Sequence, residues 1–164
     1  MSEHREIGRA ALGGGVTLTA LPDGHVVLLL AKTGAPAPDM EGLRPAGPGQ
    51  WFLVGDAPLT EAGMAALAAR LPEVALSDQS HGRVRIAVAG PQVVAMLAKG
   101  TAVDLERMAV GQSATTLIGP LGVHLTRTGP AAFELMVLRS FAAALWHDLE
   151  AMAAEYRGRN ERHH

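Results

Sequence analysis

Strict alternation of apolar residues in three segments restricts the fold of this chain more than any other feature. A period of two places the alternating residues on one face of a β-strand. Turn sequences rich in Gly and Pro separate the last two segments, which predicts strands that return antiparallel with one buried face. The alternating residues are Val84, Ile86 and Val88, then Val123 and Leu125, then Phe133, Leu135 and Val137.

The first of these strands belongs to a unit that runs from Glu73 to Asp104. A short strand over Val74–Ser77 precedes a polar corner at residues 78–82, and the alternating strand follows. Gly90-Pro91 then ends that strand and begins a helix, because proline is tolerated at the first helical position. We therefore expect strand, corner, strand and a short helix in this order.

Helical spacing of apolar residues predicts three helices, over Leu59–Leu71, Pro91–Lys99 and Phe141–Tyr156. Thr60 is the expected cap of the first, and Ser140 that of the third. In the third, Phe141, Leu145, Leu149, Met152 and Tyr156 form one expected buried stripe. The fold class is therefore α+β, a mostly antiparallel sheet with about three packed helices.

We expect one α+β domain over residues 1–156, of the usual domain size. Residues 1–9 are expected to be loose, and the charged residues 157–164 to form a frayed tail. Residues 32–50 carry so many Pro and Gly that we expect an irregular surface loop. Trp51 begins the next strand and is expected to pack in the core.

Composition excludes several classes of function. A net charge of −2 gives no electrostatic case for binding nucleic acid or an anionic membrane, and 4% aromatic residues are too few for a base-stacking platform. The absence of cysteine excludes disulfides and thiolate chemistry, and it fits a cytoplasmic protein. The longest apolar run, Val26–Ala31, is far shorter than a membrane span, and no signal peptide is visible.

No motif in the sequence predicts catalysis, cofactor binding or metal binding by this chain. Asp78, Ser80 and His81 have the side chains of a catalytic triad, but neighbouring strand residues point to opposite sides. Gly13-Gly14-Gly15 matches neither phosphate-binding pattern, so a turn is expected. The interior histidines lack the spacing of metal ligands. The expected sets of catalytic, cofactor-binding and metal-binding residues are therefore empty.

Two side-chain placements stay open from the sequence. Trp146 lies one residue off the stripe of the third helix, so it either widens the buried face or contacts another molecule. Arg127 and Glu134 lie on strands that pair across a turn, so they are candidates for a cross-strand ion pair of small energy, about 0–1 kcal/mol.

Four segments resemble the gamma subunit of heterotetrameric sarcosine oxidase. They are DQSHGRVRIAVAGP with VVAMLAKGTAVDL, VGQSATTLIGPLGVHLTRTG, AFELMVLRSFAAALWHDLE, and WFLVG after the Pro/Gly-rich stretch. The resemblance covers Leu43–Tyr156 and is densest in Asp78–Gly90 and Phe133–Leu149. The same plan is similar to the folate-binding domain of the aminomethyltransferase group, which includes the glycine-cleavage T-protein. The chain lacks the N-terminal extension of that group. Asp104 lies in a comparable stretch, Val-Asp-Leu, but the residues around it do not match those around a folate-binding acid of the group.

The resemblance implies a non-catalytic subunit that packs chiefly on the alpha subunit of a complex that also has beta and delta subunits. It implies that this chain carries no cofactor, and that FAD, FMN, NAD and tetrahydrofolate are bound by other subunits. Such a complex oxidises sarcosine to glycine and passes the one-carbon unit to tetrahydrofolate. The equivalent subunit of N-methylglutamate dehydrogenase resembles this chain to a similar degree.

The subunit hypothesis predicts an exposed apolar patch that a partner covers, with Met136 and Trp146 as candidate interface residues. A free-standing folate-binding or one-carbon transfer domain is the alternative hypothesis. That alternative predicts a concave pocket with an acidic residue beside an aromatic or methionine wall. The short chain and its few aromatic residues favour the subunit hypothesis.

Overall fold

The computed structural model describes residues 8–11 and 15–160, and these residues form two compact units. Unit 1 combines Met1–Leu21 with Val84–His164, and unit 2 is Pro22–Arg83, inserted between them. Each unit has its own antiparallel sheet and at least one helix, so the expected α+β class is confirmed. The expectation of one domain over residues 1–156 stays a prediction, because compactness does not decide whether the units unfold together.

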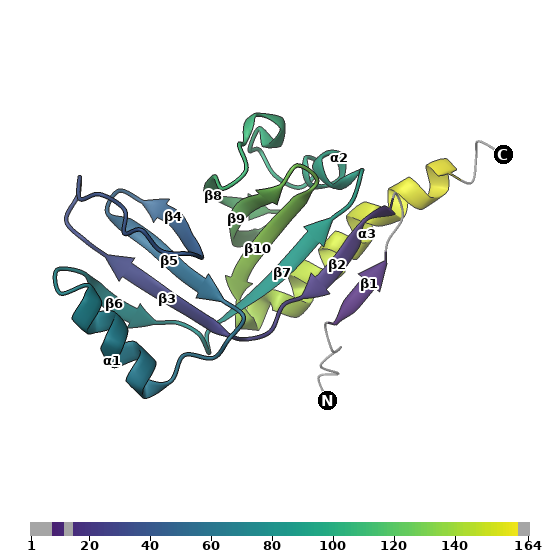
Figure 1. Ribbon diagram of the computed structural model, residues 1–164. Helices are drawn as coiled ribbons and strands as arrows, with labels where there is room; N and C mark the ends of the chain where they lie inside the picture. Colours follow the sequence, from purple (N-terminus) through teal and green to yellow (C-terminus); the bar gives the residue numbers. More distant parts are fainter. Residues whose placement is uncertain (1–7, 12–14, 161–164) are drawn as a thin grey trace. The chain divides into compact units, whose positions relative to one another are not determined.

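Within the described residues, unit 1 contains a six-stranded sheet in the order β1-β2-β7-β10-β9-β8 (Figure 1). Its registers place Leu18 opposite Val88 and Leu135 opposite Leu125, so the apolar positions of neighbouring strands share one face. The strands are β1 (Arg9–Ala11), β2 (Thr17–Ala20), β7 (Arg83–Ala89), β8 (Ser113–Ile118), β9 (Leu121–Gly129) and β10 (Ala132–Leu138).

The helix α3 (Ala142–Asn160) lies along this apolar face (Figure 1). Leu145 and Leu149 are fully buried in the core, as the stripe predicts, and Met152 is partly buried against it. Phe141 is 44% exposed, so its place in the buried stripe was wrong. It belongs to the 3₁₀ turn η3 (Arg139–Phe141), and three residues per turn rotate a side chain away from a stripe spaced for an α-helix. The side chain of Tyr156 lies outside the described part of α3.

The short helix α2 (Val93–Leu97) follows β7, later than the expected start at Pro91. Gly90 bridges the two elements with φ +142°, and a Cβ there would approach Gly15 O to 2.4 Å. Only glycine fits this close approach of two backbones. A second 3₁₀ turn, η2 (Leu105–Arg107), precedes β8.

Unit 2 contains a four-stranded sheet within the described residues, in the order β4-β5-β3-β6. The helix α1 (Glu61–Arg70) covers one of its faces (Figure 1), and Val27, Leu29, Trp51, Leu53 and Leu67 form the core between them. Trp51 is 7% exposed, which confirms its expected core position. The strands are β3 (His25–Leu30), β4 (Leu43–Gly47), β5 (Gln50–Gly55) and β6 (Ala75–Asp78).

Three expected boundaries are corrected by the structure. The stretch 32–50, expected to be irregular, contains β4, because Pro45 lies on an edge strand beside a register shift and its missing N–H breaks no central ladder. Arg9, expected to be loose, lies in β1, whereas residues 1–7 are outside the described part. The expected tail from residue 157 continues α3 as far as Asn160. Of Gly13-Gly14-Gly15, only Gly15 is described, with φ +75° as a turn requires.

Candidate functional site

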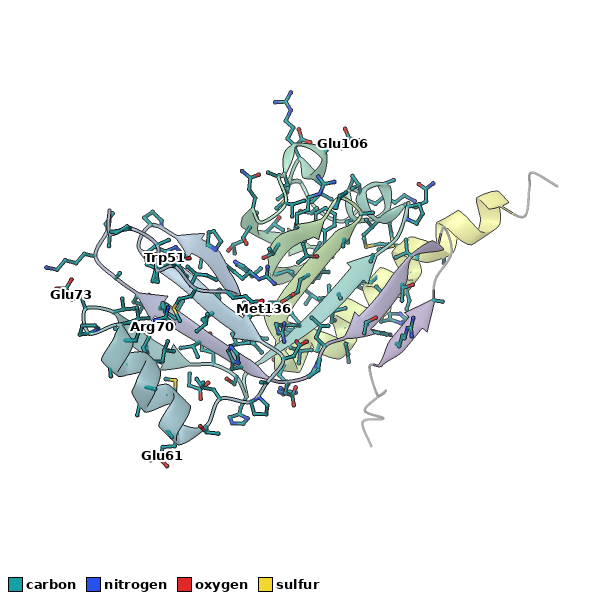
Figure 2. All side chains as sticks on the ribbon, viewed as in Figure 1. Trp51, Glu61, Arg70, Glu73, Glu106 and Met136 are labelled. Atoms are coloured by element: carbon teal, nitrogen blue, oxygen red, sulfur yellow. The ribbon has the colours of Figure 1, made fainter. Side chains whose placement is uncertain are left out.

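Both candidate interface residues are buried inside the chain itself. Trp146 is 7% exposed and belongs to the core of unit 1, so it widens the buried face of α3. Met136, labelled in Figure 2, is 2% exposed. It lies on β10 opposite His124. The expectation of an exposed apolar patch at these two residues was therefore wrong. A role for either residue at an interface stays a prediction.

Exposed apolar surface lies instead where β10 leads into α3. Leu138 and Phe141 are each 44% exposed and flank Arg139 and Ser140, which are exposed as well. The sequence signal for this surface is the step from strand to 3₁₀ turn to α-helix, because each change of element changes the direction in which side chains point. These two residues are the candidate partner surface of unit 1.

The second face of the unit 1 sheet carries buried polar side chains. Arg85 Nη1 lies 3.2 Å from Glu134 Oε1, and the two side chains are 4% and 11% exposed. Beside them, the hydroxyls of Ser113 and Thr126 lie 2.7 Å apart. The expected pairing of Arg127 with Glu134 is corrected, because Thr126 is opposite Glu134. Side chains opposite each other share a face, so Arg127 points to the other side.

Arg127 instead fastens the loop that contains η2. Its Nη1 donates to Leu105 O at 3.1 Å and to Met108 O at 2.8 Å, and its Nη2 donates to Pro130 O at 2.6 Å. The guanidinium also lies 5.4 Å from the centroid of the Phe133 ring. Several donors on one rigid plane suit arginine to hold several carbonyls at once. This side chain has a positioning role in the fold.

The Asp78–Ser80 corner is a closed hydrogen-bond arrangement. The Ser80 hydroxyl donates to Asp78 Oδ1 at 2.5 Å and accepts from the backbone N–H of Val26 at 3.0 Å. The Ser80 backbone N–H donates to the same carboxylate oxygen at 3.0 Å. These bonds, helped by the charges of His81 and His25, lower the pKa of Asp78 below its ordinary value.

This corner explains why the three triad-like residues make no triad. Ser80 is 7% exposed, and its hydroxyl donates its hydrogen bond to a carboxylate rather than to an imidazole. His81 is exposed on the turn that follows. A nucleophilic serine needs a histidine base at its hydroxyl. The corner therefore stabilises the connection between β6 and β7.

The described residues contain no group of three or more His, Asp or Glu side chains placed to hold a metal ion. In the same part of the chain, no helix has the length and apolar character to cross a membrane.

Comparison with known proteins gives one informative result. No protein-family model and no curated protein matches the sequence. The fold is similar to that of a chain in the heterotetrameric sarcosine oxidase from Corynebacterium sp. U-96, solved in complex with pyrrole 2-carboxylate. The TM-score is 0.76 at 21% identity, over 90% of this chain and 88% of that chain. The likeness is one of fold.

Proposed function

We propose that this chain is a non-catalytic subunit of a heterotetrameric sarcosine oxidase complex, in the position of the gamma subunit. The observation that supports this most directly is the fold match to a chain of that enzyme, with a TM-score of 0.76. The match covers 90% of one chain and 88% of the other, so the two chains have similar lengths. A small chain that shares nearly its whole fold with a subunit of a complex is suited to the same structural position.

The contacts of the polar side chains support a structural rather than a catalytic role. Ser80 and Asp78 bond to each other and to the backbone of β3, and Arg85 is paired with Glu134. The guanidinium of Arg127 donates its hydrogen bonds to backbone carbonyl oxygens of its own unit. Such bonds hold elements in place, whereas catalysis requires groups that face a substrate.

In this proposal the redox chemistry belongs to partner chains. The complex oxidises sarcosine to glycine, and the one-carbon unit passes to tetrahydrofolate. FAD, FMN, NAD and tetrahydrofolate are bound by other subunits, and this chain packs chiefly on the alpha subunit. We place Leu138 and Phe141 in that contact, because exposed large apolar side chains gain most from being covered.

Co-expression tests the proposal. The tagged chain is produced together with the flavoprotein chains encoded beside it, and the complex is analysed by size exclusion with a visible spectrum. We expect flavin absorbance to elute with this chain at the size of the whole complex. Elution of this chain alone and colourless contradicts the subunit function, and titration of the isolated chain with tetrahydrofolate then tests the one-carbon transfer alternative. Assays with sarcosine and N-methylglutamate decide between the two complexes.

A further inference from the structure

Gly122 is a glycine that neither the backbone nor the packing of this chain requires. It is the second residue of β9, its φ is not positive, and a Cβ added there meets no atom within 4 Å. The turn before it takes its positive φ from Gly119, at +56°. Glycine inside a strand weakens the strand, and it often marks a place where another molecule comes close to the backbone. A contact with another molecule therefore explains this glycine better than the fold does.

Two exposed leucines lie on either side of Gly122, on the second face of the unit 1 sheet. Leu117 on β8 is opposite Gly122. Met136 on β10 is opposite His124, and continuing this register by two residues places Leu138 on the other side of Gly122. Leu117 is 57% exposed and Leu138 is 44% exposed. Neighbouring strands are about 4.8 Å apart, so the backbones of the two leucines are roughly 10 Å apart across β9 (Figure 1). We call Leu117, Gly122 and Leu138 the leucine notch.

Two sides of the leucine notch are bounded by the chain itself. At the outer edge of the sheet, Gly119 N donates to Gly100 O at 3.1 Å, so the segment at Gly100 lies along the end of β8. Along the strands, the next row of this face contains His124 and Met136, which are 5% and 2% exposed. Another molecule therefore reaches Gly122 from above the face of the sheet, not by pairing with its edge.

We infer that the leucine notch receives one aromatic side chain of the alpha subunit, with its ring flat over Gly122 and its edges against the two leucines. A width of one strand fits one ring, and a ring can lie on the backbone only where no Cβ projects. The sequence has no Asp, Glu, Lys, Arg or His from Met108 to Val123, so this part of the sheet favours an apolar group over a charged one. Aromatic anchors of this kind carry much of the binding energy of interfaces.

The size and chemistry of the leucine notch favour a large protein partner over a small molecule or a second copy. Small molecules bind in concave sites with a few placed polar groups, whereas the side chains of the notch have no polar atom. Together with Phe141, the two leucines expose on the order of 300 Å² of apolar surface, below the roughly 800 Å² per partner of a stable interface. This patch alone is too small to hold a second copy. It suits one anchor within a larger contact, and it is continuous with the surface of Leu138 and Phe141 that the proposed function, on which this inference rests, places against the alpha subunit.

A competition experiment tests the inference. A variant and the unmodified chain, with different tags, are co-expressed with the flavoprotein chains, and flavin per mole of each purified chain measures their relative binding. Gly122→Leu fills the place of the ring, so it should recover about tenfold less flavin than the unmodified chain, or less still. Thr128→Leu is the matched control, because it adds the same side chain at an exposed residue of β9 about 20 Å away. This control should compete equally.

Thermal unfolding of the isolated chain tests the premise separately. Gly122→Leu should melt at or above the temperature of the unmodified chain, because the new side chain meets no atom and glycine weakens a strand. A lower melting temperature shows that the fold needs this glycine and overturns the inference. Leu117→Asp is a second variant, at an exposed residue beside Gly122. It should lose flavin to a similar extent, and it decides the question if Gly122→Leu does not fold.

The outcomes separate this inference from the proposed function. If the unmodified chain recovers flavin and both Gly122→Leu and Leu117→Asp compete equally with it, the inference is overturned while the proposed function stands. If the unmodified chain recovers no flavin, the proposed function fails, and the inference fails with it. Sedimentation of the isolated chain covers the remaining occupant. A dimer that Gly122→Leu abolishes gives the leucine notch to a second copy and overturns the alpha subunit as its occupant.

Discussion

Arg85 Nη1 lies 3.2 Å from Glu134 Oε1, on the second face of the unit 1 sheet, where β7 and β10 are neighbours. The two residues are far apart in the sequence, so their ion pair joins the strand that follows unit 2 to the strand that precedes α3. The burial of both side chains decides how much this ion pair affects the stability of the fold. Water screens an exposed ion pair, but it screens a buried one far less.

We predict that Glu134→Ala destabilises the chain by about 3–5 kcal/mol, because the charge of Arg85 then stays buried without its carboxylate. The double variant Arg85→Met with Glu134→Leu should recover much of this loss, since both buried charges are gone. Urea unfolding followed by circular dichroism measures both free energies. A double variant that is less stable than Glu134→Ala contradicts this account.

Ser80→Ala should lower the free energy of unfolding by about 1–3 kcal/mol, because the backbone N–H of Val26 loses its buried acceptor. Ser77→Ala is the control on the preceding strand β6, where the serine is exposed, and should be nearly neutral. An equal effect of both substitutions contradicts the role of the corner.

The same corner predicts a pH dependence. The Ser80 hydrogen bonds lower the pKa of Asp78 in the folded state, so this carboxylate adds stability above its unfolded pKa of about 3.9. That contribution is lost as the pH falls through the lowered pKa of the folded state. Ser80→Ala should therefore move the Asp78 carboxyl titration, followed by NMR, upward toward the ordinary value. An unchanged titration contradicts the assigned cause.

Arg127→Lys should loosen the loop around η2, because one ammonium cannot hold the carbonyls of Leu105, Met108 and Pro130 together. We expect faster amide hydrogen exchange in residues 105–112 and a loss of about 1–3 kcal/mol in unfolding free energy. Arg107→Lys is the control, because its ion pair with Asp104 is 89% and 62% exposed and contributes little. Unchanged exchange in the Arg127 variant contradicts the fastening role.

Gly90→Ala should destabilise the chain by at least about 1–3 kcal/mol, because the new Cβ needs a strained backbone and meets Gly15 O at 2.4 Å. Gly82→Ala is the control, since the nearest atom to a Cβ there is Gln79 O at 3.7 Å. Thermal unfolding compares the two. Equal melting temperatures contradict the close approach of the two backbones.

Phe141→Asp should weaken assembly with the alpha subunit without unfolding the chain, because Phe141 is 44% exposed in the chain alone. Val110→Asp is the control, an exposed apolar residue elsewhere in unit 1. Co-purification of flavin with each variant gives the readout. Full recovery of the complex with Phe141→Asp excludes this residue from the contact.

Local patterns predicted the elements of the fold well. The alternation in β7 and β10 gave their buried faces, because period two is a direct consequence of strand geometry. Thr60 caps α1 as expected, with Gly63 N donating to its hydroxyl at 3.0 Å. The α+β class followed from these elements.

Features that depend on partners distant in sequence were not predictable. We expected Glu134 to form an ion pair with Arg127 because their strands are consecutive in the sequence. In the sheet, β7 lies on the other side of β10, and it supplies the actual partner, Arg85. The strand at Pro45 is recognisable only once it is known to be at an edge. Met136 is buried on the second face of the sheet, and alternation alone does not say whether a second face is covered.

The insertion of unit 2 between β2 and β7 sets an order for folding. Thr17 pairs with Ala89, so the sheet of unit 1 cannot bring these strands together before the whole of Pro22–Arg83 has been made. Unit 2 is continuous in sequence, and its strand pairs close shorter loops, which cost less entropy. On a ribosome, the inserted unit is therefore ready to fold first, while the edge of β2 that faces away from β1 waits for β7 to emerge. A slow step in the synthesis of residues 22–83 would lengthen the time for which β2 is exposed to wrong partners.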